Sequence, residues 1–159
     1  MVAVYDWEHA STYNVYPIGV NDPLDGDRSI LIDPHLASTG SPLGWHDQGT
    51  ARFTSTIGNN VYAQENVDGG AAWENNYRPE SSTLNFDYPI NFALEPEDYM
   101  DAAITNLFYW NNIIHDVFYE YGFDEVSGNF QENNFGNGGI GSDAVQANAQ
   151  DGSGYNNAK

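Results

Sequence analysis

The stretch PEDYMDAAITNLFYWNNIIHDVFYEYG, residues 96–122, is the most regular part of this chain of 159 residues. Pro96 suits the first position of a helix, and Glu97 and Asp98 complement the positive end of the helix dipole. Gly122 suits the position just past a helix end. Start and stop signals agree, so the stretch predicts a long amphipathic helix over residues 96–121.

The periodicity of residues 96–121 predicts which face of the helix is buried and which faces solvent. Mostly apolar side chains recur at three- and four-residue steps, which is typical of a face that packs on a core; they are Met100, Ala103, Ile104, Leu107, Phe108, Asn111, Ile114, Val117, Phe118 and Tyr121. The opposite face, expected in solvent, carries Asp98, Asp101, Thr105, Asn112, Asp116 and Glu120.

The first ninety residues are mostly β-strand and turn in pattern. Residues 21–27 predict a turn, and residues 33–47, rich in Pro, Gly and Ser, predict an irregular surface connection. Alternation and β-branched content predict short strands within 2–20, at 29–32, 52–56, 60–67 and 84–88, and again at 143–150 after the helix. The expected fold class is α+β, mostly antiparallel, with one helix and a Gly/Asn-rich ribbon.

Composition limits the function. Four Lys and Arg residues against twenty-three Asp and Glu give a net charge of −19, which repels nucleic acid and anionic lipid surfaces. The length suits one domain, and 40% apolar with 14% aromatic residues favours a folded one. No apolar run approaches the roughly 20 residues that cross a bilayer, so no membrane partner is expected.

The sequence contains few side chains in the patterns that bind a metal ion. Cysteine is absent, which excludes thiolate sites, and no two of the four histidines lie four residues apart on the helix. His115 and Asp116 are adjacent, a pair that suits proton transfer. Neighbouring helical residues point about 100° apart, so we expect no direct hydrogen bond between the two side chains in the geometry that proton transfer requires. The favoured interpretation is a half-buried His115 with a local hydrogen bond and a solvated Asp116. We therefore expect neither catalytic nor metal-ligating residues here.

Two segments have calcium-like patterns. Residues 22–27 cluster carboxylates without the ligand spacing of an EF-hand, which favours an acidic turn. Residues 138–146 match the nonapeptide of calcium-binding β-rolls, yet one copy favours a Gly-rich hairpin because that architecture stacks several copies. Calcium stays an option for either segment.

The end of the chain suits backbone recognition. After the strand predicted at 143–150, Gly152 and Gly154 permit a bend before Tyr155-Asn156-Asn157-Ala158. An edge strand captures peptides through unpaired main-chain groups, and a side-chain amide such as Asn157 beside the small Ala158 would fix the register.

Several motifs in order resemble the fungalysin family of secreted zinc metallopeptidases. They are Tyr16-Pro17-Ile18-Gly19-Val20-Asn21-Asp22-Pro23, Gly58-Asn59-Asn60-Val61-Tyr62-Ala63-Gln64, Asn106-Leu107-Phe108-Tyr109-Trp110-Asn111-Asn112, Ile114-His115-Asp116, Tyr121-Gly122-Phe123-Asp124-Glu125, Asn129-Phe130-Gln131, Ala149-Gln150-Asp151-Gly152-Ser153-Gly154 and Asn156-Asn157-Ala158. The resemblance implies the N-terminal lobe of a thermolysin-like, two-lobed enzyme.

In such enzymes, the resemblance implies, an HExxH helix and a downstream Glu hold zinc between the lobes. No HExxH occurs in this chain, so the resemblance leads us to expect a lobe that is inactive alone. It gives Asn157 and Ala158 the role of holding the substrate backbone, and it implies three partners: a peptide or protein substrate, a C-terminal lobe and an N-terminal propeptide.

The resemblance also divides the chain. Residues 1–159 form a single lobe, of which 1–11 match a propeptide tail and 12–159 the start of the mature, secreted catalytic domain. The alternative is a non-enzymatic acidic module that binds peptides or proteins, with or without calcium.

Overall fold

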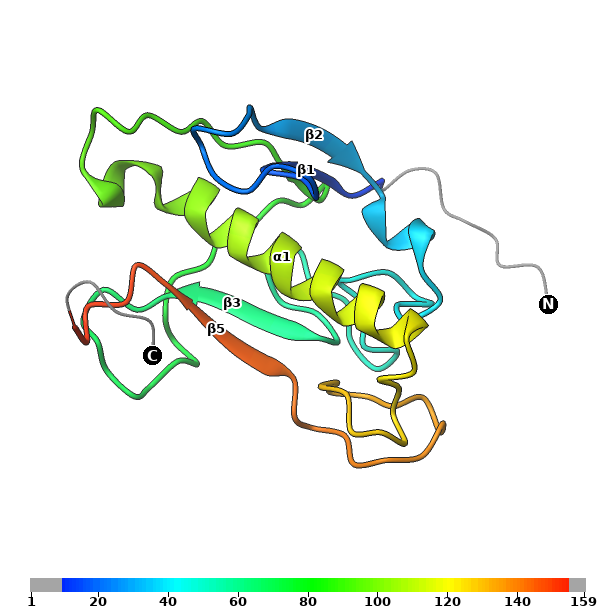
Figure 1. Ribbon diagram of the computed structural model, residues 1–159. Helices are drawn as coiled ribbons and strands as arrows, with labels where there is room; N and C mark the ends of the chain where they lie inside the picture. The colour runs from blue at the N-terminus through cyan, green and yellow to red at the C-terminus, as the bar shows by residue number, and fades with distance from the viewer. Residues whose placement is uncertain (1–9, 155–159) are drawn as a thin grey trace.

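The computed structural model describes residues 10–154. Its secondary structure runs β1 (Thr12–Val15), β2 (Ser29–Ile32), η2 (Pro34–Ala37), β3 (Val61–Glu65), β4 (Asn85–Phe86), η3 (Pro96–Tyr99), α1 (Met100–Glu120) and β5 (Val145–Ala149). These elements form the α+β fold that the sequence predicts. Figure 1 shows α1 crossing the front of the molecule, with β1 and β2 above it and β3 and β5 below.

The strands form two small sheets. One has the order β2-β1-β4, with β1 antiparallel to β2 and parallel to β4, and the other pairs β3 with β5 in parallel. Among residues 10–154, antiparallel pairing is thus confined to β1 and β2 and to three isolated bridges. Residues 52–56, predicted as a strand, contribute only bridges at Arg52 and Ser55, so that prediction is wrong.

The predicted helix exists, with a different first turn. Residues 96–99 form the 3₁₀ helix η3, and α1 itself begins at Met100. At the other end Gly122, with a φ of 93°, donates its N–H to Tyr119 O, while Phe123 donates to Phe118 O. These two bonds satisfy carbonyls of the last turn in a Schellman motif, which confirms the stop signal read at Gly122.

The core lies between α1 and the two sheets. Its buried members are Tyr13, Val15, Trp45, Val61, Ala63, Phe86, Ile104, Phe108, Tyr109, Ala147 and Ala149. The rings of Tyr13 and Phe86 stack with centroids 5.6 Å apart, and Trp45 meets Phe108 edge to face. Trp45 and His46 are buried, so the expectation that residues 33–47 are merely a surface connection is wrong.

The predicted faces of α1 are right in part. As expected, Ile104 and Phe108 are buried, Met100 and Leu107 pack against the core, and Glu120 is exposed. At seven other positions the prediction is wrong: Thr105, Asn112 and Asp116 are buried, whereas Ile114, Val117, Phe118 and Tyr121 are exposed. Periodicity identifies an apolar stripe, but it cannot say which stripe is buried when the polar one finds hydrogen-bond partners.

Candidate functional site

Asn157 and Ala158, the residues expected to hold a substrate backbone, lie outside the described residues. The structure describes the segment that leads to them, which consists of β5 and the turn at residues 150–154. The candidate site therefore begins with the contacts that fix this turn.

Asn66, buried at the end of β3, anchors the turn. Its N–H donates to Ala149 O at 3.0 Å, and its carbonyl accepts the N–H of Gly152 at 2.9 Å. The Asn66 side-chain amide donates to Asp151 Oδ2 at 2.9 Å, and Asp151 Oδ1 accepts the N–H of Ser153 at 2.7 Å. One asparagine thus ties β3 to the backbone just before the predicted substrate residues.

Glycine is required where the two segments meet. A Cβ on Gly152 would lie 2.0 Å from Val67 O, and one on Gly69 would lie 2.5 Å from Ser153 N. Gly69 also has a φ of 66°, a backbone conformation that glycine adopts without steric cost. The absence of a side chain at Gly69 permits backbone-to-backbone contact with the turn.

A chain of side chains runs from β5 to a cavity. Asn148 Oδ1 accepts a hydrogen bond from Gln64 Nε2 at 2.6 Å, and the buried Gln64 in turn accepts from Arg78 Nη2 at 2.8 Å. Burial lowers the pKa of the Arg78 guanidinium, while nearby Glu65 and Glu74 raise it. The guanidinium also donates to the carbonyls of Trp73 and Asn76.

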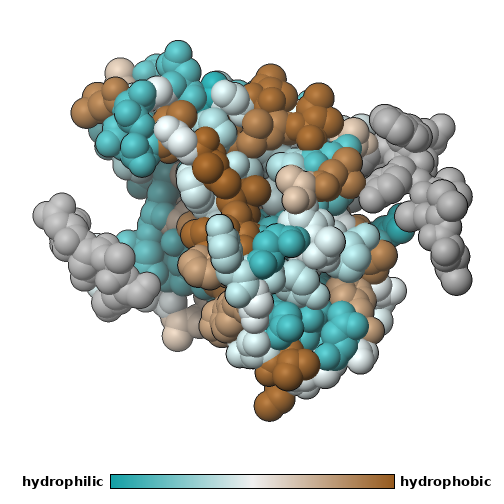
Figure 2. Space-filling view, turned by 45° about the vertical axis from the view of Figure 1, so that its right-hand side comes forward, coloured by the Kyte–Doolittle hydropathy of each residue, from teal (hydrophilic) through white to brown (hydrophobic). Residues whose placement is uncertain are grey.

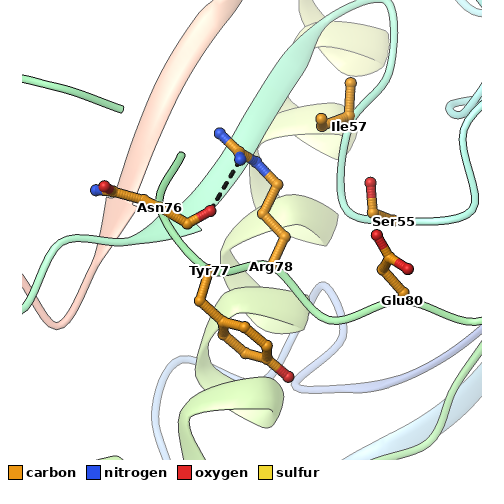
Figure 3. A pocket seen from close by; sticks show the side chains of 6 residues that line it. All are labelled: Ser55, Ile57, Asn76, Tyr77, Arg78 and Glu80. Carbon is orange, nitrogen blue, oxygen red and sulfur yellow. Dashed lines mark hydrogen bonds between the residues drawn. The ribbon is translucent and has the colours of Figure 1, made fainter. Parts of the chain in front are cut away.

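Arg78 lines a cavity of about 510 Å³ together with Ser55, Ile57, Asn76, Tyr77 and Glu80. In Figure 3 the side chains of Tyr77 and Arg78 extend in opposite directions from their shared segment. Protein acceptors hold the guanidinium of Arg78 where it lines this cavity. Sequence reasoning missed the role of both residues: Gln64 appears only as the last residue of the motif at 58–64, and Arg78 belongs to no motif.

The structure corrects the expectation for His115 and Asp116. Their side chains are both buried, and His115 Nδ1 lies 3.0 Å from Asp116 Oδ1, so the neighbours do form a hydrogen bond. Side-chain rotation closes the 100° separation that we expected to keep them apart. On the opposite side of the imidazole ring, His115 Nε2 lies 3.3 Å from Asn129 Nδ2.

Asp116 is only 3% exposed and not solvated as expected. Its Oδ2 accepts the Trp45 indole N–H at 2.8 Å, and its Oδ1 accepts the Ser41 hydroxyl at 2.6 Å. The carboxylate therefore fastens the segment around residues 41–45 to α1. These bonds give the pair a structural role, and a large aromatic residue in a Pro/Gly/Ser-rich stretch is the signal that could have located Trp45.

His46 forms a second buried polar contact in the core. Its Nδ1 lies 2.9 Å from Ser55 O, and its Nε2 lies 2.7 Å from the Tyr13 hydroxyl. The contacts fit a neutral ring that donates to the carbonyl and accepts from tyrosine. Burial lowers the pKa of His46 to about 4 and raises that of Tyr13 far above its ordinary value.

The calcium-like segments use their carboxylates locally. Asp22 Oδ1 accepts the N–H groups of Leu24 and Asp25, and Asp25 Oδ2 accepts the N–H of Asn21. In the other segment, the N–H groups of residues 142 and 143 donate to the carbonyls of residues 132 and 131, as in a hairpin.

Residues 10–154 contain no group of three or more His, Asp or Glu side chains that could hold a metal ion. The zinc that the resemblance implies therefore does not fit any side-chain set in this part of the chain. Within the same residues, no helix has the length and apolar character needed to cross a bilayer.

Comparisons with known proteins agree with the motifs in the sequence. The family model for fungalysin metallopeptidases (M36) matches residues 12–159. Extracellular metalloproteinase 2 of Trichophyton tonsurans is 51% identical over 156 residues, which cover 98% of this chain and 25% of the relative. Extracellular metalloproteinase 1 of Arthroderma otae is 50% identical over 98% of this chain and 24% of its own length.

The chain thus spans about a quarter of the length of these curated relatives. The family model covers nearly the whole chain, and the relatives align with the same region. The chain belongs to the fungalysin (M36) metallopeptidase family.

Proposed function

We propose that this chain is the N-terminal, substrate-positioning lobe of a secreted zinc metalloendopeptidase. The observation that carries the proposal is the family match over residues 12–159, together with relatives that are named extracellular metalloproteinases. Residues 1–11 then correspond to a propeptide tail and 12–159 to the beginning of the catalytic domain.

In this proposal Asn157 and Ala158 bind the backbone of a peptide or protein substrate. The contacts of Asn66 and Asp151 support it, since they fix the direction in which the chain leaves β5. A side-chain amide fixes the register of a peptide that pairs with an edge strand through its main chain.

In this proposal the lobe positions the substrate, and it does not itself cleave the peptide bond. The chain has no HExxH sequence, so zinc and the general base are supplied by a C-terminal lobe. When bound there, zinc polarises the scissile carbonyl and activates water. The lobe alone is expected to be inactive for that reason.

The experiment is zinc-dependent cleavage of casein by this chain, alone and mixed with a polypeptide that supplies the HExxH lobe of a relative. Activity only in the mixture is the expected result. Activity of the chain alone would overturn the proposal and require a metal site within this chain. Absence of activity in both arms would favour the alternative, a non-enzymatic acidic module that binds peptides or proteins, with or without calcium.

The positioning role has a separate test in the active mixture. Asn157→Ala should reduce kcat/KM for casein at least tenfold, because the amide that fixes the peptide register is lost. Asn91→Ala, at an exposed asparagine before η3, is the matched control. Equal activity of the two variants would remove Asn157 from the proposed site.

A further inference from the structure

Asn137 and Gly138 form the only Asn-Gly pair in the sequence of this chain. They belong to the loop that follows α1 and lies below the C-terminal end of the helix in Figure 1. Both residues are exposed and lie in a bend outside the helices and strands. In the lower part of Figure 2, where this loop projects, hydrophilic and hydrophobic residues both reach the surface. Solvent water therefore has direct access to the pair.

The main-chain nitrogen of Gly138 donates to no acceptor within residues 10–154. Gly138 has a φ of 97°, and because glycine has no side chain, nothing on this residue shields its nitrogen from the residue before it. Two Asp-Gly pairs of the chain differ in this respect, since the N–H groups of Gly69 and Gly152 both donate to Asn66 O at 2.9 Å. The structure thus leaves the nitrogen that follows Asn137 available for reaction.

The side-chain amide of Asn137 joins the loop to the end of α1. Its Nδ2 donates to Glu125 Oε1 at 3.0 Å, and Glu125 Oε2 accepts the Tyr119 hydroxyl at 3.1 Å. The Glu125 side chain is part of a residue that is only 4% exposed. On the other side of the pair, the Asn134 amide donates to Gly138 O at 2.8 Å. The contact with Glu125 therefore requires an amide, and not a carboxylate, at position 137.

We propose that Asn137 is a site of spontaneous deamidation through a succinimide. The deprotonated nitrogen of Gly138 attacks Cγ of Asn137, so that an N–Cγ bond forms and the Cγ–Nδ2 bond breaks. The proton lost by the Gly138 nitrogen leaves with the released ammonia. Water then adds to either carbonyl carbon of the ring and returns a proton to the nitrogen, which gives aspartate or isoaspartate. No enzyme or cofactor takes part.

The modification reverses the contact with Glu125. The amide of Asn137 donates a hydrogen bond to this buried carboxylate, whereas the product has a second carboxylate and no donor at the same place. Two carboxylates at hydrogen-bond distance repel each other. Deamidation therefore loosens the loop from the end of α1. This inference does not depend on the proposed function.

The test incubates the folded chain in mildly alkaline buffer made with heavy-oxygen water and follows each asparagine by peptide mapping with mass spectrometry. Asn137 should convert at least about tenfold faster than Asn91, which is also exposed but precedes Phe92, whose side chain obstructs attack by the main-chain nitrogen. Aspartate and isoaspartate should both form, each with one heavy oxygen atom. The rate should rise in proportion to hydroxide, because the attacking nitrogen must be deprotonated.

Variants separate the chemistry from its consequence. Asn137→Gln should not convert, because its longer side chain would have to close a larger ring. Asn137→Asp should lower the Tm relative to the control Asn91→Asp. Adding Glu125→Gln to Asn137→Asp should recover part of this loss, because glutamine can donate to the new carboxylate while its oxygen still accepts from Tyr119.

Three results would overturn the inference. Equal conversion of Asn137 and Asn91 would reject the special reactivity of the Asn-Gly pair. Formation of aspartate without isoaspartate would reject attack by the Gly138 nitrogen. Equal Tm values for Asn137→Asp and Asn91→Asp would reject the consequence at Glu125. Each of these results leaves the proposed function standing, because none of them measures proteolysis.

Discussion

Replacement of Asp116 by alanine should destabilise the fold severely, even though its position in the helix pattern marks it as solvent-facing. The buried carboxylate accepts hydrogen bonds from Ser41, Trp45 and His115 at 2.6, 2.8 and 3.0 Å. Alanine leaves three buried polar groups without their partner. Breaking one side of such a network costs about 3–5 kcal/mol of the free energy of unfolding.

The Asp116→Asn variant distinguishes the loss of hydrogen bonds from the loss of side-chain volume, because asparagine has nearly the same size as aspartate. The Asp116→Asn side chain can direct its oxygen to the Trp45 indole N–H, which only donates, and its amide to Ser41, which can also accept. The expected loss is about 1–2 kcal/mol, because hydrogen bonds to a charged acceptor are replaced by neutral ones. Asp98→Ala, at an exposed acidic residue of η3, should stay within about 0.5 kcal/mol.

Urea unfolding followed by far-UV circular dichroism measures all three variants. A double-mutant cycle with Trp45→Phe then isolates the indole–carboxylate bond, for which we expect a coupling of about 1.5–3 kcal/mol. If Asp116→Ala destabilised no more than Asp98→Ala, the carboxylate would not anchor the segment around Trp45, and the reasoning would be refuted.

Two further predictions concern the core and a turn. The free energy of unfolding in urea should fall by about 3 kcal/mol between pH 7 and pH 4 on account of His46. The folded-state pKa of His46, about 4, lies below the ordinary 6.5, so only the unfolded chain takes up a proton between these values. A His46→Phe variant whose free energy of unfolding kept the same pH dependence would contradict this. Gly139→Ala should lower the free energy of unfolding by at least about 2 kcal/mol, because the new Cβ would lie 1.8 Å from Glu125 O at a φ of 68°. Gly128→Ala is the control: at a φ of 86° in open space it should lower the free energy of unfolding by about 1 kcal/mol in the same urea titration.

Local patterns predicted the fold well where one signal dominates. The strand at Ser29–Ile32 was predicted with its observed bounds, and residues 145–149 and 61–65 lie within predicted strands. Pro96 and Gly122 bracket the helix because a missing N–H and a positive φ are backbone properties that need no partner. The parallel pairing of β3 with β5 joins residues 84 positions apart, and no local pattern specifies it.

The contacts that shape the candidate site were not predictable in the same way. Asn66, Gln64 and Arg78 act through hydrogen bonds to residues distant in sequence, and an asparagine or glutamine in a strand pattern gives no sign of its partner. The hydrogen bonds of Asp116 to Ser41 and Trp45 could not be predicted for the same reason. Hydrophobic periodicity treats every carboxylate as solvated, although a fully hydrogen-bonded one can be buried.

The reversed faces of α1 follow from two demands on one helix. Toward its own sheets the helix must hold the segment around Trp45 in one position, and the hydrogen bonds of Asp116 and Asn112 supply a direction that apolar packing lacks. The apolar residues are then left on the other face, where Ile114 and Phe118 are about half exposed. The net charge of −19 opposes association of copies of this chain through that stripe, because like charges repel. The inner, polar side of α1 therefore orders the lobe, while its apolar stripe stays outside the core.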